Sequence, residues 1–167
     1  MAADIFERLI EDHNKHRELI DQIKETSGDS EDRRTLFEQF KVDASAHANT
    51  EEETLYATIM AVSDTRVDAQ HSVKEHAEIG MMFVELDEME MSSSGWLTRF
   101  KTLADDYIHH IDEEEEEKFP KSREVIDKAK AVELRDEFNA RKPKEIKRVK
   151  AETDVPEIKK AIEEEAE

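Results

Sequence analysis

Two short stretches of the sequence pair imidazole with carboxylate side chains at a spacing that could bind metal. HANTEEETLYA begins at His47 and HIDEEEEEKFP begins at His110, and in each a glutamate follows the histidine four positions later. On a helix, residues four apart lie one above the other on the same face. His47 with Glu51, and His110 with Glu114, therefore form two matched donor pairs. Nitrogen and oxygen donors without thiolate suit iron, manganese or zinc.

Two more histidines extend the pattern through their spacing. His13 lies 34 residues before His47, and His76 lies 34 residues before His110. The midpoints of these pairs fall in TSGDSED and SSSG, and the midpoint of His47 and His76 falls in AVSDTR, all of which carry turn-forming residues. Residues equidistant from the turn of an antiparallel helix pair lie at the same height. We therefore expect all four imidazoles at one level of a helical bundle.

The alternative is that these side chains are ordinary core histidines and a solvated acidic face. A single inward histidine is usually a hydrogen-bonded core residue, but four imidazoles with two carboxylates at one level would be costly without a cation. The convergence therefore favours metal binding. We expect His16 to lie behind the ligands or to contact water in the core, and His71 and His109 to lie at the surface.

The elements that must position these residues are helices. Turn signals divide the first 120 residues into four segments, and in each of them inward residues recur at alternating spacings of three and four. With only three Gly and three Pro, the composition also favours long helices. We therefore predict an all-α bundle whose fourth segment ends at Pro120. The four segments are 3–25, 31–62, 65–90 and 95–118.

The remainder of the chain shows a weaker helical pattern. We expect one helix over 121–141 that packs on the bundle, and a second helix of undetermined docking over 143–167. No linker or second globular unit is evident in the sequence. The predicted organisation is a bundle over 1–120 and a helical extension over 121–167 that packs partly on it.

Composition excludes several classes of function. The chain has no cysteine, which rules out disulfides and thiolate metal sites, and it has no apolar run of about 18 residues. Its amino terminus is amphipathic and acidic, unlike a signal peptide, so we expect a cytoplasmic protein. The formal net charge of −19 disfavours nucleic acid and membrane surfaces as partners, while it favours cations. Protein partners and oligomeric state are not indicated.

The motifs resemble those of the hemerythrin-like, or HHE cation-binding, domain over about residues 3–120. The resemblance rests on EDH, the two His-x3-Glu pairs, KEH and the continuation to FP. It implies an up-down-up-down four-helix bundle enclosing two iron ions (Fe²⁺/Fe³⁺), bridged by two carboxylates and an oxo or hydroxo group, with manganese or zinc less expected. The ligands that it implies are His13, His47, Glu51, His76, His110 and Glu114.

The sequence departs from the oxygen-carrying members at two places. Those proteins have a second histidine one turn from the first on the third helix, where this chain has Ser72 and Gly80. Their last acid also lies five residues after the histidine, which makes Glu115 an alternative bridging ligand and His71 an alternative terminal one. With fewer protein ligands, more metal positions stay open to small molecules. This favours sensing, peroxide turnover or iron handling over oxygen transport.

Three functions follow from these observations. The first is a di-iron protein that binds or reacts with O₂, NO or peroxide in sensing, detoxification or iron handling. The second is a catalase- or peroxidase-like enzyme at the same site. The third is a non-catalytic cation-binding protein that exploits the acidic surface. A ferritin-like site is disfavoured because the sequence contains no Glu-x-x-His pair.

Overall fold

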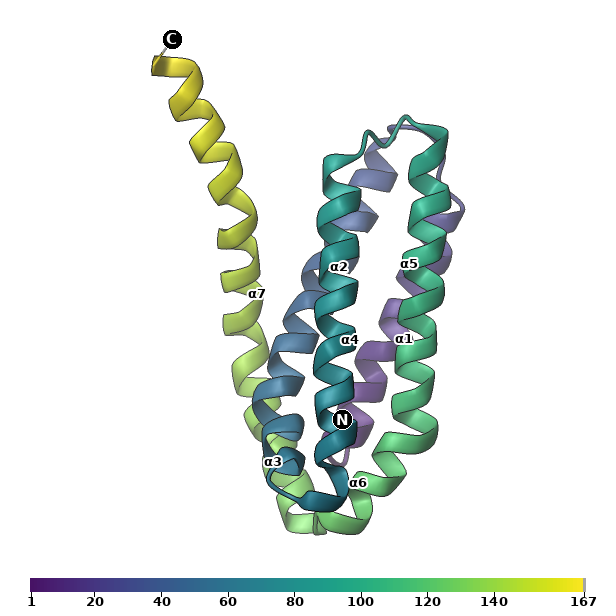
Figure 1. The fold of residues 1–167 in the computed structure, drawn as a ribbon, viewed down its shortest axis with the longest axis vertical. Helices are drawn as coiled ribbons and strands as arrows, with labels where there is room; N and C mark the ends of the chain where they lie inside the picture. The colour runs from purple at the N-terminus through teal and green to yellow at the C-terminus, as the bar shows by residue number, and fades with distance from the viewer. Residues whose placement is uncertain (167) are drawn as a thin grey trace.

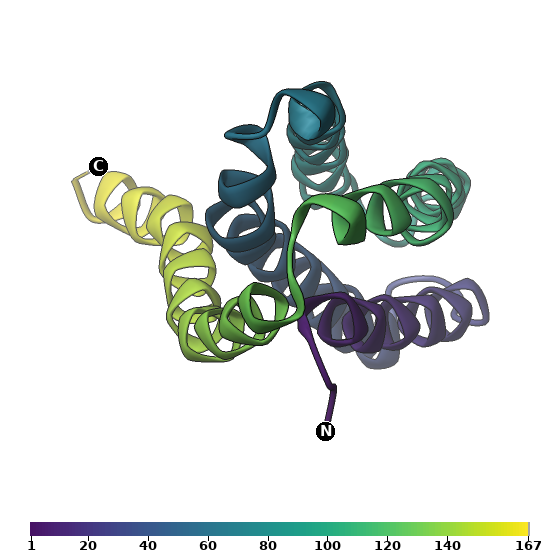
Figure 2. The same cartoon turned by 90° about the horizontal axis from the view of Figure 1, so that it is seen from below.

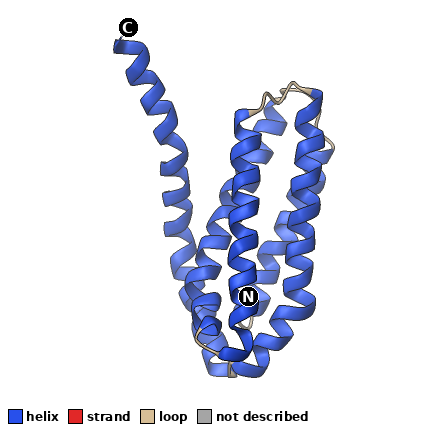
Figure 3. Ribbon diagram, in the orientation of Figure 1, coloured by secondary structure: helices blue, strands red, loops and turns tan. Residues whose placement is uncertain are grey.

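The described part of the computed structural model, backbone for residues 1–166 and side chains for residues 1–152, consists of helices joined by short turns (Figure 3). The all-α prediction is confirmed. Across the described residues, no helix carries an apolar stretch long enough to cross a membrane. The elements are α1 (Ile5–Lys24), α2 (Glu31–Glu51), η1 (Glu52–Tyr56), α3 (Ala57–Met60), α4 (Ser63–Glu88), α5 (Ser94–Glu113), η2 (Glu114–Lys118), α6 (Phe119–Val125) and α7 (Lys128–Ala166).

Helices α1, α2, α4 and α5 form an up-down-up-down bundle with short turns at alternating ends (Figure 1). Three of these helices are preceded by an N-cap residue whose side chain accepts a hydrogen bond from a backbone N–H of the first turn. The N-cap residues are Asp4, Ser30 and Ser93. Gly28, between α1 and α2, has φ of 62°, a conformation that glycine adopts without steric cost. These local signals place the turns where the sequence predicts them.

Two apolar layers fill the bundle, with a polar layer between them. One layer surrounds Trp96, whose ring stacks on Phe100 with centroids 5.5 Å apart. The other contains Phe6 and Phe119 and receives Phe138 from α7. The histidines and glutamates of the predicted site occupy the level between the two layers. Burial of the aromatic side chains therefore encloses the polar level from both ends of the bundle.

The prediction that Pro120 ends the fourth helix is wrong. Helix α5 continues through the π-helical turn η2 into α6, and Pro120 lies in the first turn of α6. In η2 the backbone N–H of Phe119 bonds to the carbonyl of Glu114, five residues back. Proline is tolerated in the first turn after such a change in hydrogen-bond register, because the N–H group that it lacks would have no regular partner there. The helix ends instead at Ile126, whose backbone is extended.

The two helices predicted over 121–141 and 143–167 are also wrong in their bounds, because one helix, α7 (Lys128–Ala166), covers most of both segments. Residues up to Val125 belong to α6, and α7 begins after Asp127, whose side chain accepts from the backbone N–H of Lys130 at 2.7 Å. Helix α7 then continues through Pro143, which has no N–H to bond to the carbonyl of Asn139. Both residues lie on the exposed side of α7, so water can bond to this carbonyl instead. Seen from below, α7 lies beside α1 and α2, and it packs against both (Figure 2).

Candidate metal centre

The six side chains predicted from the sequence meet at the polar level of the bundle. Helices α1, α2, α4 and α5 each contribute one histidine, and the two glutamates lie where α2 meets η1 and where α5 meets η2. Glu51 belongs to both donor groups, so its carboxylate lies between them. Within each group the donor atoms lie within 4.8 Å of one another: His13, His47 and Glu51 in the first, and Glu51, His76, His110 and Glu114 in the second.

The donor atoms of this cluster are buried without the partners that buried polar groups normally have. The side chains of Glu51 and Glu114 are fully buried, and none of their four oxygens has a hydrogen-bond partner among the described residues. The same holds for Nε2 of His13 and of His47. Buried carboxylates cost free energy unless paired with hydrogen bonds or a cation. The donor set therefore fits a metal ion at this level.

The second group is the tighter of the two. Nε2 of His76 lies 3.0 Å from Nε2 of His110 and 3.2 Å from Glu51 Oε1. Glu114 Oε1 approaches Nε2 of His110 to 2.5 Å. Two nitrogens bound to one ion at about 2.1 Å and at right angles would lie about 3 Å apart. The imidazoles are therefore already spaced as neighbouring ligands of one ion.

Protons compensate the buried carboxylates when no cation is bound. Burial opposes charge on His47, but the hydrogen bond to Asp12 and the nearby carboxylate of Glu51 outweigh it and raise the pKa of His47 to about 9. Burial likewise opposes charge on His110, yet the neighbouring Glu114 and Glu75 raise its pKa to about 10. Each imidazolium must lose its proton before its nitrogen can bind a metal.

Behind three of the imidazoles, a carboxylate accepts from Nδ1 and leaves Nε2 directed at the centre. The same arrangement commonly orients metal-bound histidines. Sequence reasoning missed these roles, although a signal was available. An acid directly precedes the histidine on α1 and on α4, and each of these acids bonds the imidazole of a different helix. The pairs are Asp12 with His47 at 2.8 Å, Glu75 with His110 at 3.1 Å, and Glu115 with His13 at 3.1 Å.

Neither alternative ligand enters the donor groups. Glu115 bonds Nδ1 of His13 and the guanidinium of Arg17, which places it behind the imidazole. The side chain of His71 is 49% exposed, and Nζ of Lys118 lies 3.2 Å from its Nδ1. His71 belongs to a third group of possible metal ligands, with Glu75 and Glu113. A cation already lies at this group, because Nζ of Lys118 is 3.3 Å from Glu75 Oε1. His71 thus lies outside the centre.

His16 is buried next to the centre, but both of its ring nitrogens are engaged. Nε2 lies 2.6 Å from Asp43 Oδ2, and Nδ1 lies 2.5 Å from the hydroxyl of Tyr107. Burial lowers the pKa of His16 to about 4 despite the neighbouring Asp43. A neutral ring donates from Nε2 to the carboxylate and accepts from the tyrosine hydroxyl. His16 therefore lies behind the ligands. His109, by contrast, lies at the surface, with 77% of its side chain exposed.

A small cavity opens next to the imidazoles. Its volume is about 30 Å³, and His47, His76, His110, Tyr107 and Gly80 contribute to its lining. A water molecule in the liquid occupies a similar volume. A Cβ atom built on Gly80 would meet no other atom within 4 Å among the described residues. Gly80, one of the two positions one turn from His76, thus leaves open space beside this cavity.

Both glutamates lie at the edge of a π-helical turn. Glu51 ends α2 directly before η1, and Glu114 begins η2. Such single wide turns inside α-helices are frequent at functional sites. The sequence shows these turns only as a repeat, in which the histidine is followed by glutamate at four and by an aromatic residue at nine positions. The repeated sequence thus corresponds to a repeated backbone irregularity.

Comparisons with known proteins agree with the helical fold and with cation binding. The model of the Hemerythrin HHE cation binding domain family matches residues 4–122. The crystal structure of a Hemerythrin HHE cation binding domain-containing protein from Mycobacterium kansasii is similar in fold, with a TM-score of 0.77 at 24% identity over 87% of this chain and 88% of that chain. A DNA nickase from Nostoc sp. is 28% identical over 133 residues, which are 80% of this chain and 37% of that protein's length.

Proposed function

The chain belongs to the hemerythrin HHE cation binding domain family, and we propose that it binds a pair of iron ions and through them binds or reacts with O₂, NO or peroxide. The observation that carries this proposal is the pair of buried carboxylates, Glu51 and Glu114, whose oxygens lack hydrogen-bond partners among the described residues while imidazole nitrogens face them. Anaerobic titration with Fe²⁺, followed by metal analysis, tests it.

Two ions account for the division of the donors into two groups that share one carboxylate. Glu51 is the proposed shared ligand because it is the residue common to both groups. Bound iron would supply electron transfer and open positions for small molecules, and this chemistry suits imidazole and carboxylate donors. The proposed ligands are His13 and His47 for one ion, and His76, His110 and Glu114 for the other.

The surroundings of the centre favour a very small reactant. The cavity of about 30 Å³ beside His76 and His110 accommodates a molecule of the size of water, O₂ or NO. Apolar layers on both sides limit access of water to the polar level. Gly80 at the cavity lets the reactant approach where a larger side chain would intrude. A diatomic molecule or peroxide is thus the proposed partner of the metal pair.

Peroxide turnover is a second candidate function. The observation that favours it is the hydrogen-bonded chain from Tyr107 at the cavity through His16 to Asp43. These groups can hold and pass a proton beside the centre, which acid–base chemistry on peroxide requires. Oxygen evolution from peroxide by the iron-loaded protein, lost in His110→Ala, supports an enzyme. A spectral response to NO or O₂ without turnover supports sensing.

Metal loading is expected to release about two protons per chain at pH 8. His47 and His110 have pKa values of about 9 and 10, so both rings are charged below these values when no metal is bound. Metal affinity therefore rises with pH until the two rings lose their protons. Titration calorimetry in buffers of different ionisation enthalpy measures the release. Loading without proton release would contradict the assignment of these two rings as ligands.

The activity named for the Nostoc relative is not proposed for this chain. The chain spans only 37% of that protein's length. The formal net charge of −19 opposes close approach to phosphate backbones. We accordingly propose that this chain alone does not bind nucleic acid.

A further inference from the structure

Helix α7 contributes a buried cation to the polar layer. Lys142 has only 8% of its side chain exposed, and its Nζ lies 2.9 Å from Asp12 Oδ2 and 3.0 Å from Asp43 Oδ1. The lysine lies beyond residue 122, where the family match ends. The two carboxylates belong to α1 and α2, so a single ammonium group from α7 joins three helices at this level.

Both of these carboxylates hold an imidazole. Asp12 bonds Nδ1 of His47 at 2.8 Å, and Asp43 bonds Nε2 of His16 at 2.6 Å. Without Lys142, these two neighbouring buried anions would repel each other, and among the described side chains each would keep one lysine or arginine partner, Arg8 for Asp12 and Lys15 for Asp43. Removal of one member of a buried ionic group leaves the other charge uncompensated, which is costly. Lys142, together with Arg8, therefore keeps Asp12 in place behind His47.

The other two imidazoles that a carboxylate orients, those of His110 and His13, show the same succession of contacts from imidazole to carboxylate to cation. Glu75 behind His110 lies 3.3 Å from Nζ of Lys118, and Glu115 behind His13 pairs with Arg17. Each of these three imidazoles is thus backed by a carboxylate that itself meets a cation. The cations for His110 and His13 come from within residues 4–122, whereas Asp12 behind His47 meets both Arg8 from α1 and Lys142 from α7. Lys142 thus adds a second cation, beside Arg8, to one of three such arrangements, and it is the cation that α7 contributes.

We propose that Lys142 is a positioning residue of the metal centre and that α7, through it, is part of that centre. The proposal rests on the function proposed above. Lys142 acts through Asp12, which directs Nε2 of His47 at the ion. Loss of such a partner behind a metal-binding histidine typically weakens metal affinity about 10–100-fold. Because Lys142 acts one contact further out, we expect about tenfold.

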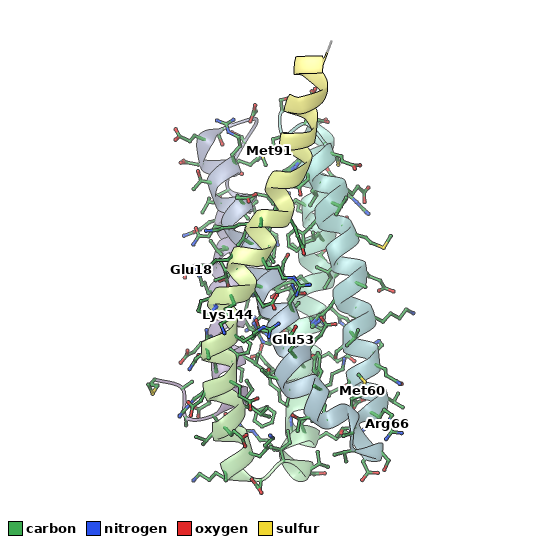
Figure 4. The ribbon with its side chains drawn as sticks, turned by 90° about the vertical axis from the view of Figure 1, so that its left-hand side faces the viewer. Glu18, Glu53, Met60, Arg66, Met91 and Lys144 are labelled. Carbon is green, nitrogen blue, oxygen red and sulfur yellow. The ribbon has the colours of Figure 1, made fainter. Side chains whose placement is uncertain are left out.

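The test compares four proteins that each span residues 1–167, with Co²⁺ as the probe because its visible spectrum reports ligand geometry. The double variant Lys142→Met/Asp43→Asn removes one positive and one negative charge, so that the net charge near the ion is kept. Lys142→Arg keeps a cation that can reach both carboxylates. Lys144→Met is the matched control, an exposed lysine two residues further along α7 (Figure 4).

The double variant is expected to bind Co²⁺ about tenfold more weakly than the wild type and to show a shifted visible spectrum. The Co²⁺ affinities of Lys142→Arg and Lys144→Met should lie within about threefold of the wild-type affinity. Their visible spectra should match the wild-type spectrum. Equal affinity and an unchanged spectrum in the double variant overturn the positioning role while leaving the proposed function intact. A wild type that takes up neither Co²⁺ nor Fe²⁺ overturns both.

A second measurement needs no variant and covers the case in which the double variant fails to fold. Coupling between two sites is reciprocal, so a metal ion at the centre must also stabilise the contact of Lys142. Hydrogen exchange of backbone amides around Lys142 should slow on Co²⁺ loading of the wild type, relative to the remote turn that contains Gly28. Unchanged exchange in α7 contradicts the proposal.

Discussion

Glu51→Gln is expected to lower metal affinity more than about 100-fold, because the substitution neutralises the carboxylate shared by both donor groups. Loss of a partner behind a ligand already costs about 10–100-fold, and a shared ligand should cost more. Glutamine nearly preserves the volume at this fully buried position, so the helices should remain in place. Competition with a chelator of known affinity, monitored together with helical circular dichroism, measures both effects.

The matched control for this experiment is Glu116→Gln, which makes the same chemical change at an exposed position of η2. Its affinity should equal that of the wild type. If Glu51→Gln and Glu116→Gln bound metal equally well, general attraction of cations to the acidic surface would explain the binding. The third function derived from the sequence, a non-catalytic cation-binding protein, would then replace the metal pair.

Phe138→Ala is expected to lower the free energy of unfolding by about 3–5 kcal/mol, the usual cost of deleting a buried aromatic ring. Phe138 is fully buried in α7, its ring meets that of His47 at 5.8 Å, and the guanidinium of Arg8 lies 4.9 Å from its centroid. Chemical denaturation of the metal-free protein gives the value directly. The expected loss is large because the ring joins α7 to the layer below the centre.

Glu137→Ala, at the neighbouring exposed position of α7, serves as the control and should change stability by less than about 0.5 kcal/mol. A cost below about 1 kcal/mol for Phe138→Ala would show that α7 does not dock on the bundle in solution. In that case the contacts of Lys142 would lose their structural basis as well.

The level of the site could be predicted from the sequence because helix geometry is regular. Equal distances of His13 and His47 from one turn, and of His76 and His110 from another, placed four imidazoles at one height. The periodic inward positions also fixed which face of each helix is buried. Helix α4 is the exception, since its inward positions Val73, His76 and Gly80 are only partly buried.

The backbone irregularities could not be predicted in the same way. The π-helical turns η1 and η2 change the register by one residue, and sequence periodicity does not resolve such a change. For this reason Pro120 was expected to end a helix that in fact continues to Val125. The same turns decide between Glu114 and Glu115, since the structure directs the first toward His110 and the second toward His13.

The groups behind the ligands depend on tertiary contacts. Asp12 and Glu75 each precede a histidine in the sequence, yet each bonds a histidine of another helix. Periodicity assigns a face to a residue but does not specify its partner across the bundle. Lys142 was the hardest to anticipate, because a charged residue next to Pro143 is typical of an exposed segment, whereas here it is buried against Asp12 and Asp43.

The most direct test of the central proposal is the metal content of the wild-type protein after anaerobic loading with Fe²⁺ and removal of loosely bound ions, measured beside Glu51→Gln. The proposal predicts about two iron ions per chain in the wild type and a large loss in the variant. One ion or none in the wild type, or equal content in the two proteins, would contradict a pair of iron ions sharing Glu51.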